Sequence, residues 1–325
     1  MGALFSYSWN EDCWPDFLNA AAANPNAEFI AILNPNSGPI TDTGDPSLYC
    51  VPVLREKIPG IVLVGYVRTG YNKRDPGDVA NDINTYRTWG SLSVDAGGVS
   101  GTPKLDGIFL DETDTFMESE DGLDKYITYA KTVKQMFGDD GLTIYNPGTE
   151  ANQKLYDTGA MVVAYESPYS EFDSVNLPTD STMRANSAIM LINFPTDPST
   201  LESVVKTIVS DGYGALFITS AQIEKEDVYQ VFGENWNEFV QDVADLSTSS
   251  SSSSDSNSSS STTATASATN TAQTASTPTA TGSTGETAQQ GNTNAAATGT
   301  RWDFVVLGGA ALLACGVLVV GCKVA

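Results

Sequence analysis

Short apolar runs that alternate with helical segments constrain the fold of this chain more than any other feature of its sequence. Eight such runs precede Leu246, and most of them end in polar residues. A continuous apolar run of four to eight residues is typical of a parallel strand that is buried on both faces. The predicted strands cover residues 3–8, 28–33, 61–67, 106–110, 142–145, 161–165, 187–192 and 215–220.

Segments with helical spacing of apolar residues lie between these strands. A strand followed by a helix, repeated eight times, predicts a (β/α)8 TIM barrel. The repeats end near residue 247, and about 250 residues is the usual length of such a barrel. A doubly wound open sheet is the alternative. The predicted helices include residues 14–23, 79–89, 123–137, 201–210 and 236–246.

The composition changes after the predicted barrel, which occupies residues 1–247. Residues 248–300 consist mainly of Ser, Thr and Ala with almost no large apolar side chains. Such a segment cannot bury enough apolar surface to fold, so we predict a disordered low-complexity stalk. In an extracellular protein it would be O-glycosylated and extended, and otherwise it would be a flexible linker. Asn257 begins an N-glycosylation sequon in this segment.

Residues 301–325 form a C-terminal hydrophobic segment. The apolar run at 304–321 is long enough to cross a bilayer as a single-pass transmembrane helix. Small residues and a polar spacer ahead of it also match a GPI-anchor signal, with Asn292 or Asn294 as the lipid-modified residue. Both readings predict a membrane-attached protein on the extracellular face of the plasma membrane or in the cell wall. No N-terminal signal peptide is visible, because the first predicted strand begins at Ala3.

Several chemistries are excluded by residues that the chain lacks. It contains no histidine, which rules out Ser-His-Asp and Cys-His catalysis and most zinc sites. No glycine-rich nucleotide-binding motif follows a predicted strand, so dinucleotide and nucleotide chemistry have little support. Cys13 and Cys50, the two cysteines of the barrel region, form either a disulfide or two buried free thiols. The net charge of −24 makes nucleic acid an improbable partner, and nothing indicates an obligate protein partner.

Carboxylates, amides, hydroxyls and aromatic rings follow the predicted strands. In a barrel these positions meet at the C-terminal face, where active sites lie. This combination of side chains is typical of a carbohydrate site, because aromatic rings stack on sugars and paired acids perform acid–base chemistry. The acids are Asp111, Glu112 and Glu166, and the candidate substrate-binding residues are Asn34, Asn36, Tyr66, Arg68, Tyr71, Asn146, Tyr165, Asn193 and Ser220.

Five sequence motifs together resemble the spherulin-4-like glycoside hydrolases, which form glycoside hydrolase family 135. They are NPNSGP at 34–39, GYVRTGY at 65–71, DINTYRTW at 82–89, GIFLDE at 107–112 and YNPGT at 145–149. The resemblance extends from residue 3 to about residue 246. It implies a (β/α)8 barrel that cleaves galactosaminogalactan, a polymer of N-acetylgalactosamine and galactosamine, by endo hydrolysis without a cofactor.

The acidic positions of this family fall on Asp111, Glu112 and Glu166. Adjacent residues of an extended segment point to opposite sides, so Asp111 and Glu112 are not expected to act on the same bond. We hypothesise that Asp111 is the nucleophile or stabilises the transition state, that Glu166 is the general acid, and that Glu112 supports them. The structural alternatives are a helix cap at Glu166 and an exposed loop residue at Glu112. The alternative function is a wall-glycan-binding or coat protein without catalysis.

Overall fold

A computed structural model of the chain describes residues 13–252, except 97, 115–119, 173–176, 227 and 230, together with 316–319. Several predictions lie outside the described residues: the first strand at 3–8, the sequon at Asn257, the lipid-attachment candidates Asn292 and Asn294, and most of the stalk and of the C-terminal segment. Residues 248–252, which we predicted as stalk, belong instead to the last helix, α8 (Trp236–Ser252).

Seven parallel strands form one curled sheet in the order in which they occur along the chain. The doubly wound alternative is therefore wrong, because its strand order would reverse at a switch point. All seven predicted strands that the structure describes are confirmed, with ends that shift by a few residues. They are β1 (Ile30–Asn34), β2 (Val62–Arg68), β5 (Gly107–Asp111), β6 (Leu142–Tyr145), β7 (Met161–Pro168), β8 (Ser187–Ile192) and β9 (Ala215–Ile218).

The C-terminal strand β10 (Gly316–Val319) pairs with the outer edge of β1 in the antiparallel direction. Among the described residues no pairing joins β10 to β9, so the sheet is a curled half-barrel rather than a closed barrel. β10 is the described part of the predicted C-terminal hydrophobic segment, and it is a strand, whereas the transmembrane alternative predicted a helix. Within the described parts of the chain, no helix combines the length and the apolar character that crossing a bilayer requires.

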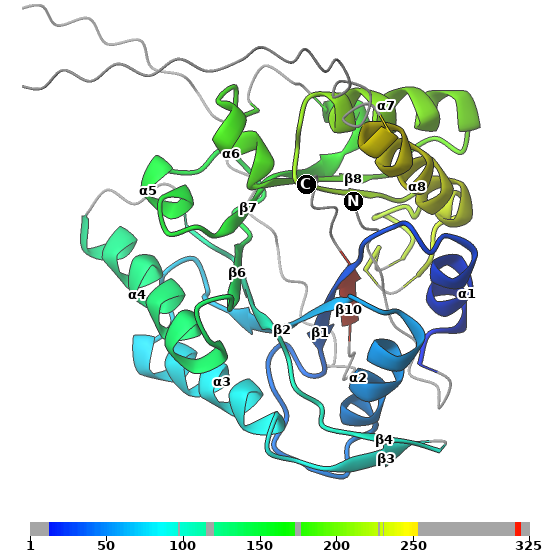
Figure 1. The fold of residues 1–325 in the computed structure, drawn as a ribbon. Coiled ribbons are helices and arrows are strands. Elements are labelled where there is room, and N and C mark those ends of the chain that lie inside the picture. Colours follow the sequence, from blue (N-terminus) through cyan, green and yellow to red (C-terminus); the bar gives the residue numbers. More distant parts are fainter. Residues whose placement is uncertain are drawn as a thin grey trace, which may run out of the picture. The chain divides into compact units, whose positions relative to one another are not determined.

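Helices cover the outer face of the curled sheet (Figure 1). Three of them begin with Asp-Pro, in which the Asp side chain caps the helix and Pro occupies its first turn: α2 (Pro46–Lys57), α3 (Pro76–Trp89) and α7 (Pro198–Ser210). This signal explains why α3 and α7 begin three residues earlier than their apolar spacing predicted. The remaining helices are α1 (Pro15–Ala23), α4 (Glu120–Phe137), α5 (Gln153–Tyr156) and α6 (Ser181–Ala185).

Alternate residues of each strand enter different apolar clusters. Ala31 and Leu33 of β1 pack against the helices, whereas Ile32 points to the inside of the curl together with Phe109. All four of these side chains are almost completely buried. Burial on both faces explains why the strands read as continuous apolar runs. A small antiparallel sheet of β3 (Val94–Ala96) and β4 (Val99–Gly101), which we did not predict, lies beside α2.

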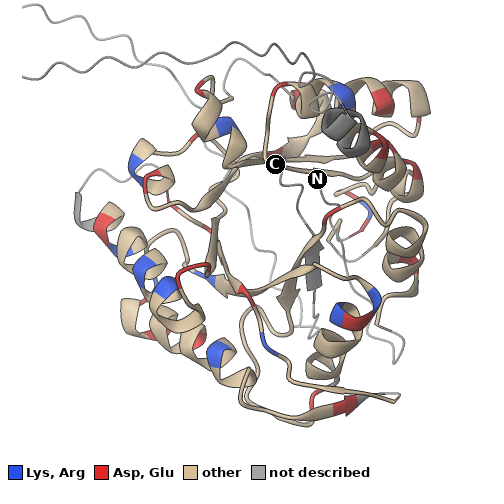
Figure 2. Cartoon of the chain, viewed as in Figure 1, with Lys and Arg blue, Asp and Glu red and all other residues tan. Residues whose placement is uncertain are grey.

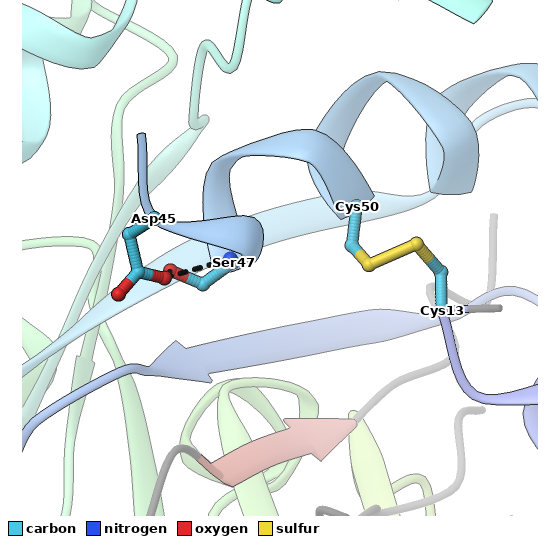
Figure 3. Close-up of a disulfide and its surroundings, with 4 residues drawn as sticks. All are labelled: Cys13, Asp45, Ser47 and Cys50. Atoms are coloured by element: carbon cyan, nitrogen blue, oxygen red, sulfur yellow. Dashed lines mark hydrogen bonds between the residues drawn. A yellow bond between two sulfur atoms is a disulfide. The ribbon is translucent and has the colours of Figure 1, made fainter. Parts of the chain in front are cut away.

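A disulfide joins Cys13, just ahead of α1, to Cys50 in α2 (Figure 3). The sulfur atoms are 2.03 Å apart and the Cα atoms 5.3 Å apart. The disulfide prediction is confirmed, and the alternative of two free thiols is wrong. In Figure 3, Asp45 caps the start of the same helix by accepting hydrogen bonds from Ser47. α2 is therefore fixed at its first turn and tied to α1.

Candidate active site

Asp111, Asn146 and Glu166 lie at the C-terminal ends of β5, β6 and β7. These strands are neighbours in the sheet, so their ends bring the three side chains together. The Asn146 amide nitrogen donates to Asp111 Oδ1 and to Glu166 Oε2, each over 2.8 Å. Asn146 is only 7% exposed and both acids are partly buried. One amide group thus holds two carboxylates at a fixed separation.

A tyrosine hydroxyl donates to the second oxygen of each carboxylate. Tyr66, on β2 beside β5, donates to Asp111 Oδ2 over 2.5 Å. Tyr229, in the segment that follows β9, donates to Glu166 Oε1. The two acids and their three hydrogen-bond donors form one continuous network, which we call the acid pair network: Tyr66, Asp111, Asn146, Glu166 and Tyr229.

The two acids differ in how strongly their surroundings favour the charged form. Burial raises the pKa of Asp111, but hydrogen bonds from Tyr66, from the backbone N–H of Glu112 and from Asn146 oppose that rise. Burial also raises the pKa of Glu166, and the charge of Asp111 raises it further, against hydrogen bonds from Tyr229 and Asn146. Asp111 therefore has one more donor than Glu166, and its negative charge favours a proton on Glu166.

Glu112 turns away from the extended conformation of β5. Its φ of 54° lies in the left-handed region, which is uncommon for a residue with a side chain. The Glu112 carboxylate accepts a hydrogen bond from Arg68 Nε over 2.7 Å, in an ion pair whose arginine side chain is 55% exposed. This bond raises the pKa of Arg68. Glu112 thus contacts a cation, whereas the Asp111 carboxylate contacts three neutral donors.

Thr69 holds the backbone of this turn. Its hydroxyl lies 2.9 Å from the Asp111 carbonyl oxygen and 2.7 Å from that of Glu112, so the two carbonyls share its single hydrogen. The Tyr126 hydroxyl oxygen lies 3.0 Å from the same Thr69 oxygen, within hydrogen-bond distance. Because both carbonyls are held, the strained conformation of Glu112 is determined by its surroundings.

Tyr71 lies at the open rim of the site. Its side chain is 49% exposed, and its backbone N–H donates to the Glu112 carbonyl oxygen. Partial burial raises the pKa of its phenol, with further increases from the charges of Glu112, Asp111 and Glu166. The ring is thus near all three acids, where an exposed aromatic face can pack on a sugar.

The other predicted binding residues make contacts that organise loops. Asn34 accepts from the backbone of Gly38 and so closes the turn that contains the exposed Asn36. Asn193 bonds the backbone of Ile223 and the carboxylate of Glu224. Ser220 bonds Asn235, ahead of α8, and Tyr165 packs edge-on against Phe172. These contacts show that the side chains of Asn34 and Asn193 hold turns of the backbone.

Sequence reasoning missed Thr69 and Tyr229. Thr69 directly follows Arg68 at the end of β2, so its position at a strand end was a usable signal. Tyr229 lies 63 residues from Glu166 in a segment without strand or helix periodicity, and no sequence signal pointed to it. In the described part of the chain, no three Cys, Asp or Glu side chains are grouped so that they could hold a metal ion.

The family model for "Spherulation-specific family 4" matches residues 3–243. Spherulin-4 of Physarum polycephalum is 33% identical over 160 residues, which are 49% of this chain and 42% of that protein. The chain thus spans less than half of the length of this relative.

Among solved structures, the crystal structure of Aspergillus clavatus Sph3 in complex with GalNAc matches with a TM-score of 0.64 and 25% identity. The match covers 75% of this chain and 97% of that one. The glycoside hydrolase domain of PelA from Pseudomonas aeruginosa matches with a TM-score of 0.31 and 16% identity, too weak a likeness to support an argument. The curled α/β sheet is thus the fold of Sph3, and the chain belongs to the spherulation-specific family 4.

Proposed function

We propose that the protein is a glycoside hydrolase that cleaves a polysaccharide containing N-acetylgalactosamine and galactosamine, such as galactosaminogalactan, within the chain. The observation that carries this proposal is the bridge that Asn146 makes between Asp111 and Glu166. Most glycosidases use two carboxyl groups in unlike surroundings, one as the general acid and the other as the nucleophile or base, and Asp111 and Glu166 lie together at one edge of the sheet. The likeness to Sph3, which was solved with GalNAc, supports the choice of sugar.

In the proposed mechanism Asp111 is the nucleophile. Its three hydrogen-bond donors favour the carboxylate, which attacks the anomeric carbon as the bond to the leaving oxygen breaks. Glu166, whose pKa is raised by burial and by the charge of Asp111, donates its proton to that oxygen. Water then attacks the glycosyl intermediate and returns a proton to Glu166. Glu112 holds Arg68 at the rim, and Tyr71 provides a stacking surface.

The stereochemistry follows from the distance between the acids. The Asp111 and Glu166 oxygens that share the Asn146 amide are each 2.8 Å from its nitrogen, so they lie at most twice that distance apart. Retaining glycosidases hold their carboxyl groups about 5 to 5.5 Å apart, whereas inverting enzymes need roughly 6.5 to 9.5 Å to admit a water molecule. This limit on one pair of oxygens favours the shorter separation of retaining enzymes, and on that basis we propose retention of the anomeric configuration.

We also propose that the enzyme acts outside the cell. The Cys13–Cys50 disulfide supports this location, because such bonds persist in oxidising compartments. An acidic protein also attracts a polymer that carries free amino groups. In this proposal residues 253–300 are a stalk, and the segment at 3–8 is the eighth parallel strand of a (β/α)8 barrel.

The test is release of reducing ends from purified galactosaminogalactan by the full chain, with the anomer of new ends followed by NMR. Asp111→Asn and Glu166→Gln should each lower kcat by about 10²–10⁴-fold. Asp139→Asn and Glu56→Gln, which remove exposed acids elsewhere, should retain the parent rate. A folded parent that binds the polymer without releasing ends would instead indicate a glycan-binding or coat protein. First appearance of the inverted anomer would contradict the proposed nucleophile.

A further inference from the structure

The two oxygens of the Glu166 carboxyl group have partners of different chemistry. Oε2 accepts from the Asn146 amide, whose nitrogen can only donate. Oε1 contacts the Tyr229 hydroxyl, which can donate or accept. In the charged form of Glu166 both oxygens accept, so both contacts are satisfied.

The protonated form of Glu166 has a different requirement. One oxygen must then be a carbonyl acceptor and the other must carry hydrogen. The Asn146 N–H group faces Oε2, so Oε2 is the carbonyl oxygen and the hydrogen resides on Oε1. Oε1 can donate that hydrogen to the Tyr229 oxygen. The Asn146–Glu166–Tyr229 arrangement therefore suits both protonation states of Glu166. A second amide N–H in place of the Tyr229 hydroxyl could only donate, so it could not accept the hydrogen of the protonated form.

The chain around Tyr229 holds this hydroxyl in place. Val228, only 2% exposed, belongs to the apolar cluster inside the curl of the sheet, and Tyr229 packs against that cluster. Upstream, the backbone N–H of Ile223 is bound by Asn193 at the end of β8. Downstream, Asn235 bonds the backbone N–H of Ser220, just after β9. Tyr229 thus lies between two anchored points of its segment.

We propose that Tyr229 is a positioning residue that holds Glu166 through both of its protonation states by reversing the direction of one hydrogen bond. This inference rests on the proposed hydrolase function. In the first step the Oε1 proton passes to the leaving glycosidic oxygen as Asp111 bonds to the anomeric carbon. Tyr229 then donates its hydroxyl hydrogen to the new Oε1 anion. In the second step a water proton returns to Oε1 as the water oxygen replaces Asp111, and the Tyr229 hydroxyl becomes the acceptor again.

The test is Tyr229→Phe in the full chain, which keeps the ring and removes the hydroxyl. Tyr213→Phe is the matched control, because the Tyr213 hydroxyl is also buried but bonds the Pro178 carbonyl oxygen. We expect kcat on galactosaminogalactan to fall about 10-fold with little change in KM. Although Tyr229 bonds both forms of Glu166, its bond to the charged carboxylate is the stronger one and lowers the pKa of Glu166, so its loss should raise that pKa. The basic limb of the kcat profile should then move upward by about one pH unit. Tyr213→Phe should leave kcat and the pH profile unchanged.

A second readout does not depend on activity. The Glu166 carboxyl resonance, assigned by its absence in Glu166→Gln, can be titrated by ¹³C NMR in the parent and in Tyr229→Phe. A higher midpoint in Tyr229→Phe supports the inference even if the parent releases no reducing ends, a result that would overturn the proposed function alone. An active parent whose Tyr229→Phe variant keeps the parental midpoint and pH profile overturns the inference and leaves the proposed function intact.

Discussion

Asp111 and Glu166 are both acids at strand ends, and their neighbours favour the charged form of Asp111 more strongly than that of Glu166. Tyr66 comes from β2, beside the strand of Asp111, and donates over 2.5 Å. Tyr229 reaches Glu166 from a loop on the other side of the site. Asn146 serves both acids equally. The different roles that we propose for the two acids therefore rest on the extra backbone donor at Asp111 and on the repulsion that its charge exerts on Glu166.

Tyr66→Phe tests the nucleophile side of this assignment. The Tyr66 hydrogen bond lowers the pKa of Asp111, so its removal should raise that pKa further. Because the nucleophile must be ionised, the acidic limb of kcat/KM should shift to higher pH, by about one unit. Activity assays across pH measure the shift. Tyr156→Phe, which removes a buried hydroxyl bonded to Ser187, is the control and should keep the parental profile. An unmoved acidic limb in Tyr66→Phe would contradict the assignment.

Site residues at strand ends could be predicted from the sequence, and site residues in loops could not. Asp111, Asn146 and Glu166 end apolar runs, so their meeting at one edge could be predicted from the sequence. Their separation could not, because it depends on one side-chain amide and on the curl of the sheet. Tyr229 could not be predicted either, because a loop residue is placed by tertiary packing of its neighbour Val228.

Among the elements, the strands were the easiest to predict, since burial on both faces makes their sequences continuously apolar. The helices α5 and α6 were missed because one turn of helix gives no detectable periodicity. α2 was missed for a different reason. It contains Pro52, and its apolar and polar residues are not segregated into two faces. The capping signal at Asp45-Pro46 was the better indicator of this helix.

Gly65 shows how one position allows α3 to pack on β2. A Cβ atom at Gly65 would lie 2.6 Å from the ring of Tyr86, which is fully buried. Gly65→Ala should therefore destabilise the protein by about 1–3 kcal/mol through overpacking, as measured by urea unfolding. Gly44→Ala in an exposed loop is the control and should change stability by much less. Equal unfolding midpoints for the two variants would mean that Tyr86 can move aside without cost.

At the scale of the whole molecule, charge and packing are separated in space. The strands are largely uncharged, and charged residues lie mainly on the outer helices and in loops (Figure 2). Aspartate and glutamate outnumber lysine and arginine by 40 to 16. Asp111 and Glu166, at the inner strand ends, are partly buried, and this burial raises their pKa values. Burial of acids costs stability, and acids with raised pKa values are concentrated at functional sites.

The disulfide is the one covalent cross-link that the structure describes, and it joins the segment ahead of α1 to α2 across 37 residues. Cross-linking restricts the unfolded chain, and a loop of this length is expected to contribute about 2–4 kcal/mol. The double variant Cys13→Ala, Cys50→Ala should lose that stability in denaturant titrations of the full chain without reductant. Adding reductant should destabilise the parent to a similar extent, and it should leave the double variant almost unchanged because that variant lacks the Cys13–Cys50 bond. Cys315 and Cys322 are present in both proteins, so any effect of reductant on them is common to both. If the double variant unfolded at the same denaturant concentration as the parent, the N-terminal segment would be held by burial of Trp14 and Phe17 rather than by the cross-link.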